Sequence, residues 1–397
     1  MSNNRVAQIL TITTMNLQNI SKRKASSLSA IIGIACVVAI LVGVLSIREG
    51  FRATLDRSGA TDVAVVLRVG SDSEMSSGLS YEETRIIGDA DSVVRENGLP
   101  LVSPELFVTV DVPLRSTGTP ANVPFRGVAT QAAALRQNFE ITEGRMFTSG
   151  KFELIAGTSA AREFSGLSVG NTVHWGTTDW HVVGLFNDGG SVSESEVWTD
   201  VNVLQGAYNR GNTFQSMRVK LGSPEDLAGF KDDLSTIPHL NVRAMSEREY
   251  YSQQSKSVSR IISSIGYFVA LLMGIGAIFG ALNTMYSAIS NRAREIATLR
   301  ALGFGGAPVI VSVLTESMIL GLIGGVAGCA LAYLGFNNIH VSTLNFTSSS
   351  QVAFAFSVTP ALLINGLFYS LILAFIGGVI PGLKAIRQPI VSGLRQL

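Results

Sequence analysis

The chain alternates between long apolar stretches and one long segment of mixed polarity. Four stretches, 25–47, 261–290, 307–336 and 359–383, contain almost no charged side chains. An α-helix rises about 1.5 Å per residue, so about 20 apolar residues cross a hydrocarbon core of about 30 Å. Each stretch is long enough, and the pattern predicts a membrane protein with four transmembrane α-helices.

The segment 48–260, between the first and second predicted spans, has the pattern of a folded domain. Its apolar and polar runs alternate and are broken by Gly, Pro and Asn, as in short strands and helices joined by turns. The predicted strands are Asp62–Val69, Leu106–Val112, Glu153–Ala156, Thr172–His174, Trp180–Phe186 and Ser216–Leu221, and the predicted helices are Tyr81–Glu96, Thr158–Phe164 and Glu225–Ser235. This mixture predicts a large α+β domain with two subdomains, inserted between transmembrane helices 1 and 2.

Helical patterns also continue from two of the spans into this domain. Residues 50–55 prolong the first span, and residues 247–260 run directly into the second. We therefore expect two stalk helices at the base of the inserted segment.

Composition supports one membrane part and one folded domain. Of 397 residues, 47% are hydrophobic and 15% are charged, whereas soluble domains carry about 25% charged residues. The net charge of +1 gives no reason to expect a nucleic-acid partner. Cys36 and Cys329 both lie in apolar stretches, so no disulfide framework is predicted for the domain.

Basic residues flank the spans on one side. Lys22, Arg23 and Lys24 precede the first span. Arg292, Arg294 and Arg300 follow the second, and Lys384, Arg387 and Arg395 follow the fourth. The positive-inside rule then predicts cytoplasmic N- and C-termini, an extracytoplasmic segment 48–260, a short outer loop at 337–358 and a cytoplasmic tail at 384–397. Apolar residues at helical spacing within 1–24 predict a helix in the inner membrane interface.

The predicted spans contain one carboxylate and several pairs of small residues. Glu316 lies about ten residues into the third span, where Asn283 of the second span is a possible hydrogen-bond partner. A carboxyl group at that depth has either a structural or a mechanistic role, and the sequence leaves both open. Glycines at four-residue spacing favour close helix packing, within one chain or between two. They are Gly276, Gly280, Gly321, Gly324, Gly325 and Gly328.

No pattern of catalytic or metal-binding residues is present in the sequence. His174 and His181 lie near Asp179 but lack the spacing of metal ligands. There is no G-x-S-x-G nucleophile motif and no G-x-x-x-x-G-K-[ST] phosphate-binding loop. We therefore predict a non-catalytic chain without a metal or cofactor of its own, in which any ATP is bound by a partner.

The stretch 291–303, NRAREIATLRALG, resembles the core signature of the MacB/FtsX permease superfamily of ABC transporters. The residues carrying the match are Arg294, Glu295, Leu299, Arg300, Ala301, Leu302 and Gly303. The residues that the resemblance implies for coupling to an ATPase are Arg292, Arg294, Glu295, Leu299, Arg300, Leu302 and Gly303. Further similarity lies in the sequences GRMF (144–147), ELIAGTSAAREF (153–164) and VVGLF (182–186), and in the tail after Pro381. The layout, in which no ATPase domain precedes the first span, is similar to that of the lipoprotein-releasing permeases LolC and LolE.

The resemblance implies that 291–306 is a cytoplasmic coupling helix that docks into a separate ABC ATPase. It further implies a multi-pass protein of the bacterial inner membrane, surrounded by lipid and paired with a second copy or a related permease. A periplasmic adaptor or a lipoprotein is a further expected partner. The expected function is that of a type VII ABC permease, in which ATP hydrolysis moves the periplasmic domain (mechanotransmission) to export or extract a lipophilic or periplasmic substrate. The alternative is an FtsX-like regulator of an extracytoplasmic enzyme such as a cell-wall hydrolase.

Overall fold

The computed structural model describes residues 13–14, 24–301, 305–345 and 350–387. These residues form two compact units. The membrane unit contains the described residues up to Glu49, together with Ile261–Ile339 and those from Phe356 onward. The inserted domain contains Gly50–Arg260 and His340–Ala355. The predicted interfacial helix (1–24) and the end of the predicted tail (388–397) lie almost entirely outside the described residues.

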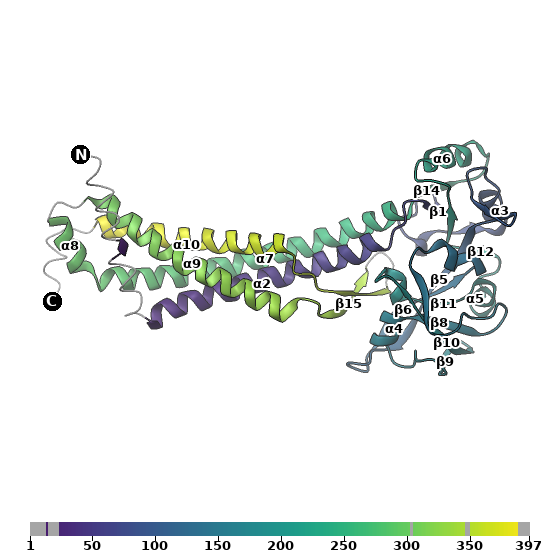
Figure 1. Cartoon of the computed structure of the whole chain (residues 1–397), viewed down its shortest axis with the longest axis horizontal. Coiled ribbons are helices and arrows are strands. Elements are labelled where there is room, and N and C mark those ends of the chain that lie inside the picture. Colours follow the sequence, from purple (N-terminus) through teal and green to yellow (C-terminus); the bar gives the residue numbers. More distant parts are fainter. Residues whose placement is uncertain (1–12, 15–23, 302–304, 346–349, 388–397) are drawn as a thin grey trace. The chain divides into compact units, whose positions relative to one another are not determined.

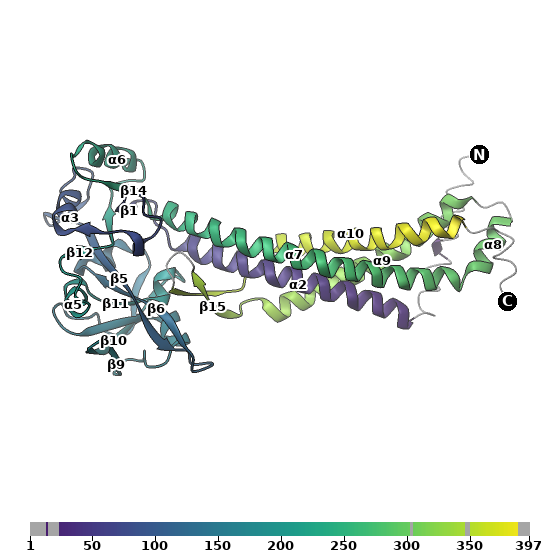
Figure 2. The same cartoon turned by 180° about the vertical axis from the view of Figure 1, so that it is seen from behind.

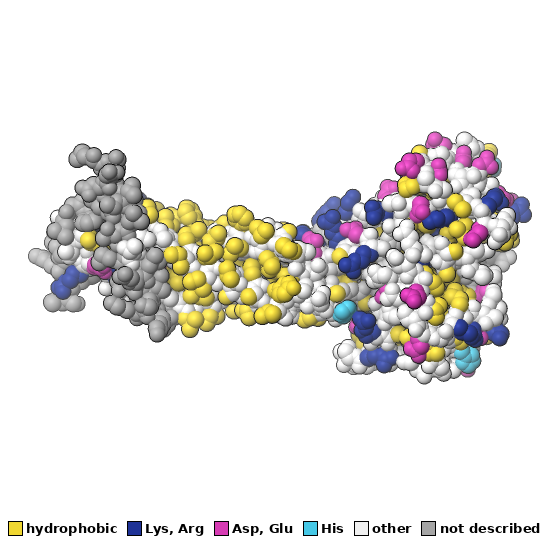
Figure 3. Space-filling model, viewed as in Figure 1, with side chains coloured by type: hydrophobic (Ala, Val, Ile, Leu, Met, Phe, Trp, Pro, Cys, Tyr) yellow, Lys and Arg dark blue, Asp and Glu magenta, His cyan; other side chains and the backbone are white. Residues whose placement is uncertain are grey.

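Four long apolar helices build the membrane unit. They are α2 (Lys24–Arg57), α7 (Glu247–Ser290), α9 (Gly306–Phe336) and α10 (Pro360–Arg387). Each contains an 18-residue window with a mean hydropathy of 2.0 to 3.0, which confirms the four predicted spans. Figures 1 and 2 show the helices running side by side within this unit. In Figure 3 hydrophobic side chains gather on the visible face of these helices, whereas charged side chains are scattered over the inserted domain.

Small residues allow α9 to pack closely against α10. A Cβ atom on Gly321 would lie 2.3 Å from the Cβ of Ala374, and one on Gly325 would lie 2.2 Å from Oγ of Ser370. The hydroxyl of Ser317 donates to the carbonyl oxygen of Ala374 at 2.6 Å. Close backbone approach and interhelical hydrogen bonds hold helices together where lipid provides no hydrophobic driving force.

The next face of α9 packs against α2 in the same manner. A Cβ on Gly324 would lie 3.0 Å from the carbonyl oxygen of Ile31, and one on Gly328 would lie 2.5 Å from that of Ala35. By contrast, a Cβ on Gly276 or on Gly280 of α7 would meet nothing within 4 Å. The four predicted glycines of the third span therefore form close contacts inside this chain, whereas Gly276 and Gly280 do not.

The inserted domain is built on one mixed β-sheet. The strand order is β14 (Val242–Ser246), β1 (Val63–Arg68), β13 (Ser216–Lys220), β5 (Val102–Pro113), β6 (Pro120–Val128), β11 (Val197–Asp200), β8 (Glu153–Gly157), β10 (Thr178–Asp188) and β7 (Phe139–Gly144), with β9 (Thr172–Trp175) also paired to β10. The pairs β6–β11 and β8–β10 are parallel, and the others are antiparallel. The remaining helices are α3 (Tyr81–Gly88), α4 (Thr158–Glu163), α5 (Val201–Ala207) and α6 (Asp226–Thr236).

Strand β5 joins two halves of the sheet. Residues 102–105 pair with β13, and residues 106–113 pair with β6. One hydrophobic core nevertheless runs through both halves, from Val66 and Phe230 to Phe125 and Trp180. A second cluster around Trp198 and the buried Phe186 lies in the β8–β10–β11 half. The two predicted subdomains are thus two halves of one sheet that share a core.

A β-hairpin from the loop between α9 and α10 completes the inserted domain. Strands β15 (His340–Asn345) and β16 (Ser350–Ala355) form this hairpin, where the sequence predicted only a short loop. The amide of Ala353 donates to Oγ of Ser195 at 3.0 Å. The Phe354 ring is buried and lies edge-on to Phe51, with the ring centroids 5.7 Å apart.

The predicted helix Tyr81–Glu96 is wrong in its second half. Helix α3 begins with a capping box between Ser80 and Glu83 and ends at Gly88. The chain then forms β3 (Arg95–Glu96) and β4 (Leu99–Pro100) around the turn Asn97–Gly98, where φ is 51° and 83°. Positive φ at both turn residues is typical of a two-residue hairpin turn, and Asn-Gly is its favoured sequence.

Several strands escaped prediction because their sequences carry weak strand signals. Strand β6 contains Pro120 and Pro124, and proline ordinarily argues against a central strand. The proline at 124 is tolerated because β6 pairs with β11 only from Phe125 onward. Strand β11 has four residues, too few to show an alternating pattern.

We predict that Gly321→Ala destabilises the membrane unit by about 1–3 kcal/mol, because the added methyl group overpacks the α9–α10 contact. Gly335→Ala, on the same helix, is the matched control because a Cβ there meets nothing within 4 Å. Thermal unfolding in mild detergent measures the difference. Equal melting temperatures for the two variants would contradict the packing described here.

Candidate functional site

The corner between α7 and α9 contains a short amphipathic helix. Helix α8 (Ala293–Ala301) follows the end of α7 at Ser290 and precedes α9. Ala293 and Ala297 are buried, whereas Arg294, Thr298 and Ala301 are exposed. Residues three or four apart share one face of a helix, so the exposed residues form a single outward face.

The three arginines of the predicted coupling segment have different surroundings. Nε of Arg292 lies 3.0 Å from Oε2 of Glu295, an ion pair within the segment. Nη1 of Arg300 donates to the carbonyl oxygen of Ile386 in the last turn of α10 at 2.8 Å. Arg294 is exposed on the outer face. The structure thus assigns Arg292 and Arg300 to contacts within the chain, a distinction that the sequence could not make.

A cavity of about 30 Å³ lies where α7, α8 and α9 meet. Arg292, Glu295 and Leu299 line it together with Glu316 and apolar residues of α7 and α9. Glu316 is 5% exposed. Three of the predicted coupling residues and the predicted intramembrane carboxylate therefore border one cavity.

Other predicted site residues lie elsewhere. Asn283 is exposed on α7 and does not line the cavity of Glu316, so the structure does not bring these two residues together there. Leu302 and Gly303 lie outside the described residues. His174 and Asp179 form an exposed pair on the β9–β10 hairpin, with Nδ1 and Oδ1 2.7 Å apart.

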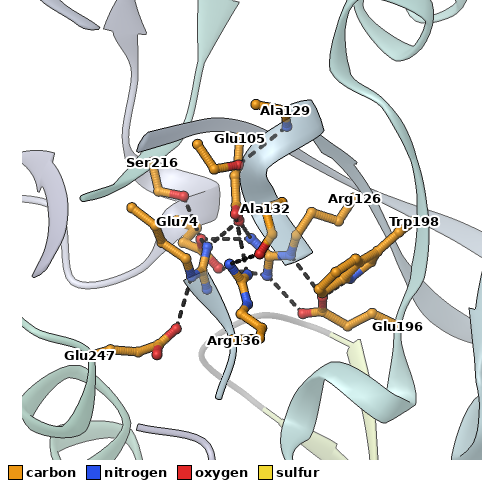
Figure 4. A network of polar contacts seen from close by, with 12 residues as sticks. Glu74, Glu105, Arg126, Ala129, Ala132, Arg136, Glu196, Trp198, Ser216 and Glu247 are labelled. Carbon is orange, nitrogen blue, oxygen red and sulfur yellow. Dashed lines mark hydrogen bonds and ion pairs between the residues drawn. The ribbon is translucent and has the colours of Figure 1, made fainter. Parts of the chain in front are cut away.

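A second constellation, absent from the sequence analysis, is a buried network of charges in the inserted domain (Figure 4). Its three guanidinium groups and four carboxylates belong to Arg126, Arg136, Arg218, Glu74, Glu105, Glu196 and Glu247. None of these residues is more than 9% exposed. Desolvated charges are stable only where ion pairs and hydrogen bonds satisfy them, and here the arginines provide both.

Arg126 of β6 is the centre of this network. Its guanidinium makes two bonds to Glu196, at 2.8 and 2.7 Å, and two to Glu74, at 2.8 and 2.9 Å. A fifth bond, of 2.9 Å, reaches Glu105 on β5. The planar fork of arginine suits such paired contacts, which a lysine could not reproduce.

The network also binds the first turn of α7 to the sheet. Arg218 of β13 contacts Glu105 and donates from Nε to Glu247, the first residue of α7, at 2.9 Å. Its Nη2 donates to the hydroxyl of Tyr251 at 3.3 Å. Glu247 in turn accepts from the amide of Ala60, just beyond the end of α2, at 3.3 Å. The ends of α2 and α7 that lie in the inserted domain are thereby held to one another and to the central strands.

The arginines keep two carboxylates of the network, Glu74 and Glu105, ionised. Burial alone would raise the pKa of Glu74, but Arg126 and Arg218 lower it well below its ordinary value. The pKa of Glu105 is likewise lowered, because Arg218, Arg136 and Arg126 outweigh the effect of its burial. Both groups are therefore carboxylates at neutral pH. The signal that could have revealed them is the presence of single charged residues within apolar strand patterns, such as Arg126 in PFRGV.

Two protein-family models cover most of the chain. The MacB-like periplasmic core domain matches residues 27–237, and the FtsX-like permease C-terminal region matches residues 267–390. The second match contains α8 and its cavity.

Individual relatives are distant in sequence but match over most of the chain. It is 23% identical to the macrolide export ATP-binding/permease protein MacB of Bdellovibrio bacteriovorus, over 95% of this chain and 60% of that protein. It is 21% identical to the ABC transporter permease YknZ of Bacillus subtilis, over 96% of this chain and 98% of that protein. The chain thus spans about 60% of the length of the MacB relative.

Two solved structures are similar to somewhat less than half of the chain. The periplasmic region of MacB from Actinobacillus actinomycetemcomitans has a TM-score of 0.38 and 12% identity, covering 49% of this chain and 93% of that one. The extracellular domain of YknZ from Gram-positive bacteria has a TM-score of 0.35 and 17% identity, covering 46% of this chain and 99% of that one.

We predict that Arg126→Met lowers the free energy of unfolding of the inserted domain by about 3–5 kcal/mol, since it leaves buried carboxylates without their partner. Urea unfolding followed by tryptophan fluorescence reports on this domain, because all three tryptophans, at 175, 180 and 198, belong to it. Arg52→Met, which breaks the exposed Arg52–Asp56 pair, is the control and should cost no more than about 1 kcal/mol. A loss of similar size in both variants would show that the network adds no stability.

Proposed function

Because the chain belongs to the MacB/FtsX family of ABC transporter permeases, we propose that it is the membrane subunit of a type VII transporter. A separate ATPase hydrolyses ATP, α8 receives the movement, and the inserted domain changes conformation on the periplasmic side. The work performed is export or extraction of a lipophilic or periplasmic substrate, with an adaptor or a lipoprotein as a further partner.

The exposed face of α8 is the observation that carries this proposal. It is a short helix between two spans, and its outward face contains Arg294, whose guanidinium suits an acidic groove on a partner. The inward face is tied to the rest of the membrane unit through Arg300 and the carbonyl oxygen of Ile386. A push on α8 therefore reaches α7 and α9 through the chain and α10 through this bond.

The placement of basic residues supports a cytoplasmic position for α8. The ammonium group of Lys384 lies 4.6 Å from the centroid of the Tyr286 ring, so the end of α10 lies against the end of α7. The arginines of α8 are at this same end of the membrane unit. Basic residues thus gather at one end of the membrane unit. The positive-inside rule requires this of an inner-membrane protein with both termini in the cytoplasm.

We favour transport over the regulatory role of an FtsX-like protein because of the inserted domain. This domain matches the MacB-like periplasmic core over its main part, up to residue 237. The FtsX-like similarity, residues 267–390, covers the last three spans and includes only the β15–β16 hairpin of the inserted domain.

A second permease copy is expected to cover α7. Only 22% of the apolar window of α7 is buried, compared with 56% for α2. Large exposed residues recur on α7 at alternating spacings of four and three: Ile261, Ile265, Phe268, Leu272, Ile275 and Phe279. This spacing places them in one stripe, the pattern of a helix that packs lengthwise against another. We propose that the stripe faces the second permease.

We predict that Arg294→Glu abolishes co-purification of the ATPase from native membranes, because it places a negative charge on the docking face of α8. Arg387→Glu is the matched control, an exposed arginine at the same end of the membrane unit but on α10. Pull-down of the tagged chain in mild detergent, with protein identification, measures the effect. Undiminished ATPase in the Arg294→Glu sample would refute the assignment of α8.

We predict that Phe268→Cys forms a disulfide-linked dimer on mild oxidation in native membranes. The background is Cys36→Ala/Cys329→Ala, which removes both native thiols. Leu331→Cys, an equally exposed position on α9, controls for random collision. Electrophoresis without reductant should show a dimer for position 268 and a monomer for position 331; the reverse would place the contact on another helix.

A further inference from the structure

The inserted domain contains a cavity of about 200 Å³ at the outer end of α2. Its walls come from four separate parts of the chain: the last turn of α2, helix α4, the loop 187–194 and the β15–β16 hairpin. Arg57, Arg162 and His340 line it, each from a different wall. A space of this size holds much more than one water molecule.

Arg57 and Arg162 are exposed, and their contacts differ from those of six other arginines of the inserted domain. Arg68, Arg115, Arg126, Arg136, Arg145 and Arg218 all make side-chain hydrogen bonds within the domain. Within the described part of the chain, neither guanidinium of the cavity makes an ion pair or a hydrogen bond of its own. Their donors therefore remain available to a ligand in the cavity.

The carboxylates in the walls do not neutralise these arginines. Glu194 is buried, and its Oε1 accepts from the amides of Asp188 and Gly190 at 3.0 and 2.6 Å. Its Oε2 accepts from the hydroxyls of Thr158 and Ser159 at 3.1 and 3.2 Å. Four donors thus satisfy this carboxylate, which braces the loop against α4. Glu163 also has an interaction of its own.

The remaining walls suit an anion that has an apolar part. Asn187 lines the cavity, and its side-chain oxygen accepts from the amide of Gly189 at 2.9 Å, so its NH₂ group is left to donate. Phe354, Ala353 and Ala355 supply apolar surface on the hairpin side. A Cβ on Gly190 would lie 3.5 Å from Nη1 of Arg57, so this guanidinium lies against the turn at the rim.

We propose that this cavity binds a phosphate group, either free or as the headgroup of an anionic phospholipid. Two guanidinium groups and an amide NH₂ match the several oxygens of a phosphate, which arginine binds in a paired manner. A bound phosphate would join α2, α4 and the hairpin, three segments that are distant in the chain. This inference depends on neither the ATPase nor the identity of the transported substrate.

The test titrates the full-length purified chain, in uncharged detergent, with three probes: inorganic phosphate, short-chain phosphatidylglycerol and short-chain phosphatidylcholine. Calorimetry gives the affinities. Wild-type protein should bind the phosphatidylglycerol, and Arg57→Gln/Arg162→Gln should weaken that binding at least tenfold. Arg85→Gln/Arg210→Gln removes the same charge from two exposed sites of the inserted domain and should bind as the wild type does.

The probes separate the two sources of phosphate. Binding of phosphatidylglycerol well above that of inorganic phosphate identifies a lipid headgroup site, and equal binding identifies a site for the free anion. The proposal is overturned if neither anion binds, if phosphatidylcholine binds as tightly as phosphatidylglycerol, or if both double variants lose binding equally. Unchanged tryptophan fluorescence of the double variants shows that the domain has kept its fold.

Discussion

The buried guanidinium of Arg126 is the group around which the inserted domain is organised. It lies on β6, accessible to almost no solvent, and contacts carboxylates from three other segments, Glu74, Glu105 and Glu196. A charge placed there requires all three partners, because a desolvated arginine with fewer would be strongly unfavourable. The requirement fixes the positions of η2 (Glu74–Ser76), of β5 and of the segment before β11. Arg218 on β13 is a second buried arginine of this kind. It forms ion pairs with Glu105 and with Glu247 at the start of α7.

The network also joins the two long helices that enter the inserted domain. Glu247 is bonded both to Arg218 and to the backbone beyond α2, so the two helices share one attachment. Paired contacts between guanidinium and carboxylate groups are geometrically specific as well as strong. The ends of α2 and α7 within this domain are thus held at defined positions on the central strands. Arg57 and Arg162 of the proposed phosphate site lie outside this network, and their guanidinium groups have no partner among the described residues.

The sequence predicted the features that depend on local pattern. The four spans follow from hydropathy alone, and the helical continuity of 247–260 with the second span follows from a polar segment at helical spacing. The family signature around Arg294 was identified in the same way. The β3–β4 hairpin could also have been predicted, since Asn97–Gly98 is a strong turn signal that the apparent helix pattern concealed.

The features that sequence reasoning missed depend on contacts between distant residues. Nothing near Arg300 in the chain indicates that its partner is Ile386, 86 residues later. Arg126 and Glu196 are 70 residues apart, and each alone resembles an ordinary outward-facing strand residue. The cavity beside Glu316 likewise needs three helices to define it.

The hairpin β15–β16 has a consequence for the order of folding during synthesis. Its Phe354 and Val352 are buried in the inserted domain, yet they are made only after α9. When the ribosome has completed the first three spans, this domain therefore still lacks the β15–β16 hairpin. The ring of Phe51 then still lacks its contact with the ring of Phe354. The inserted domain can therefore complete its core only after the chain has been synthesised past Phe354.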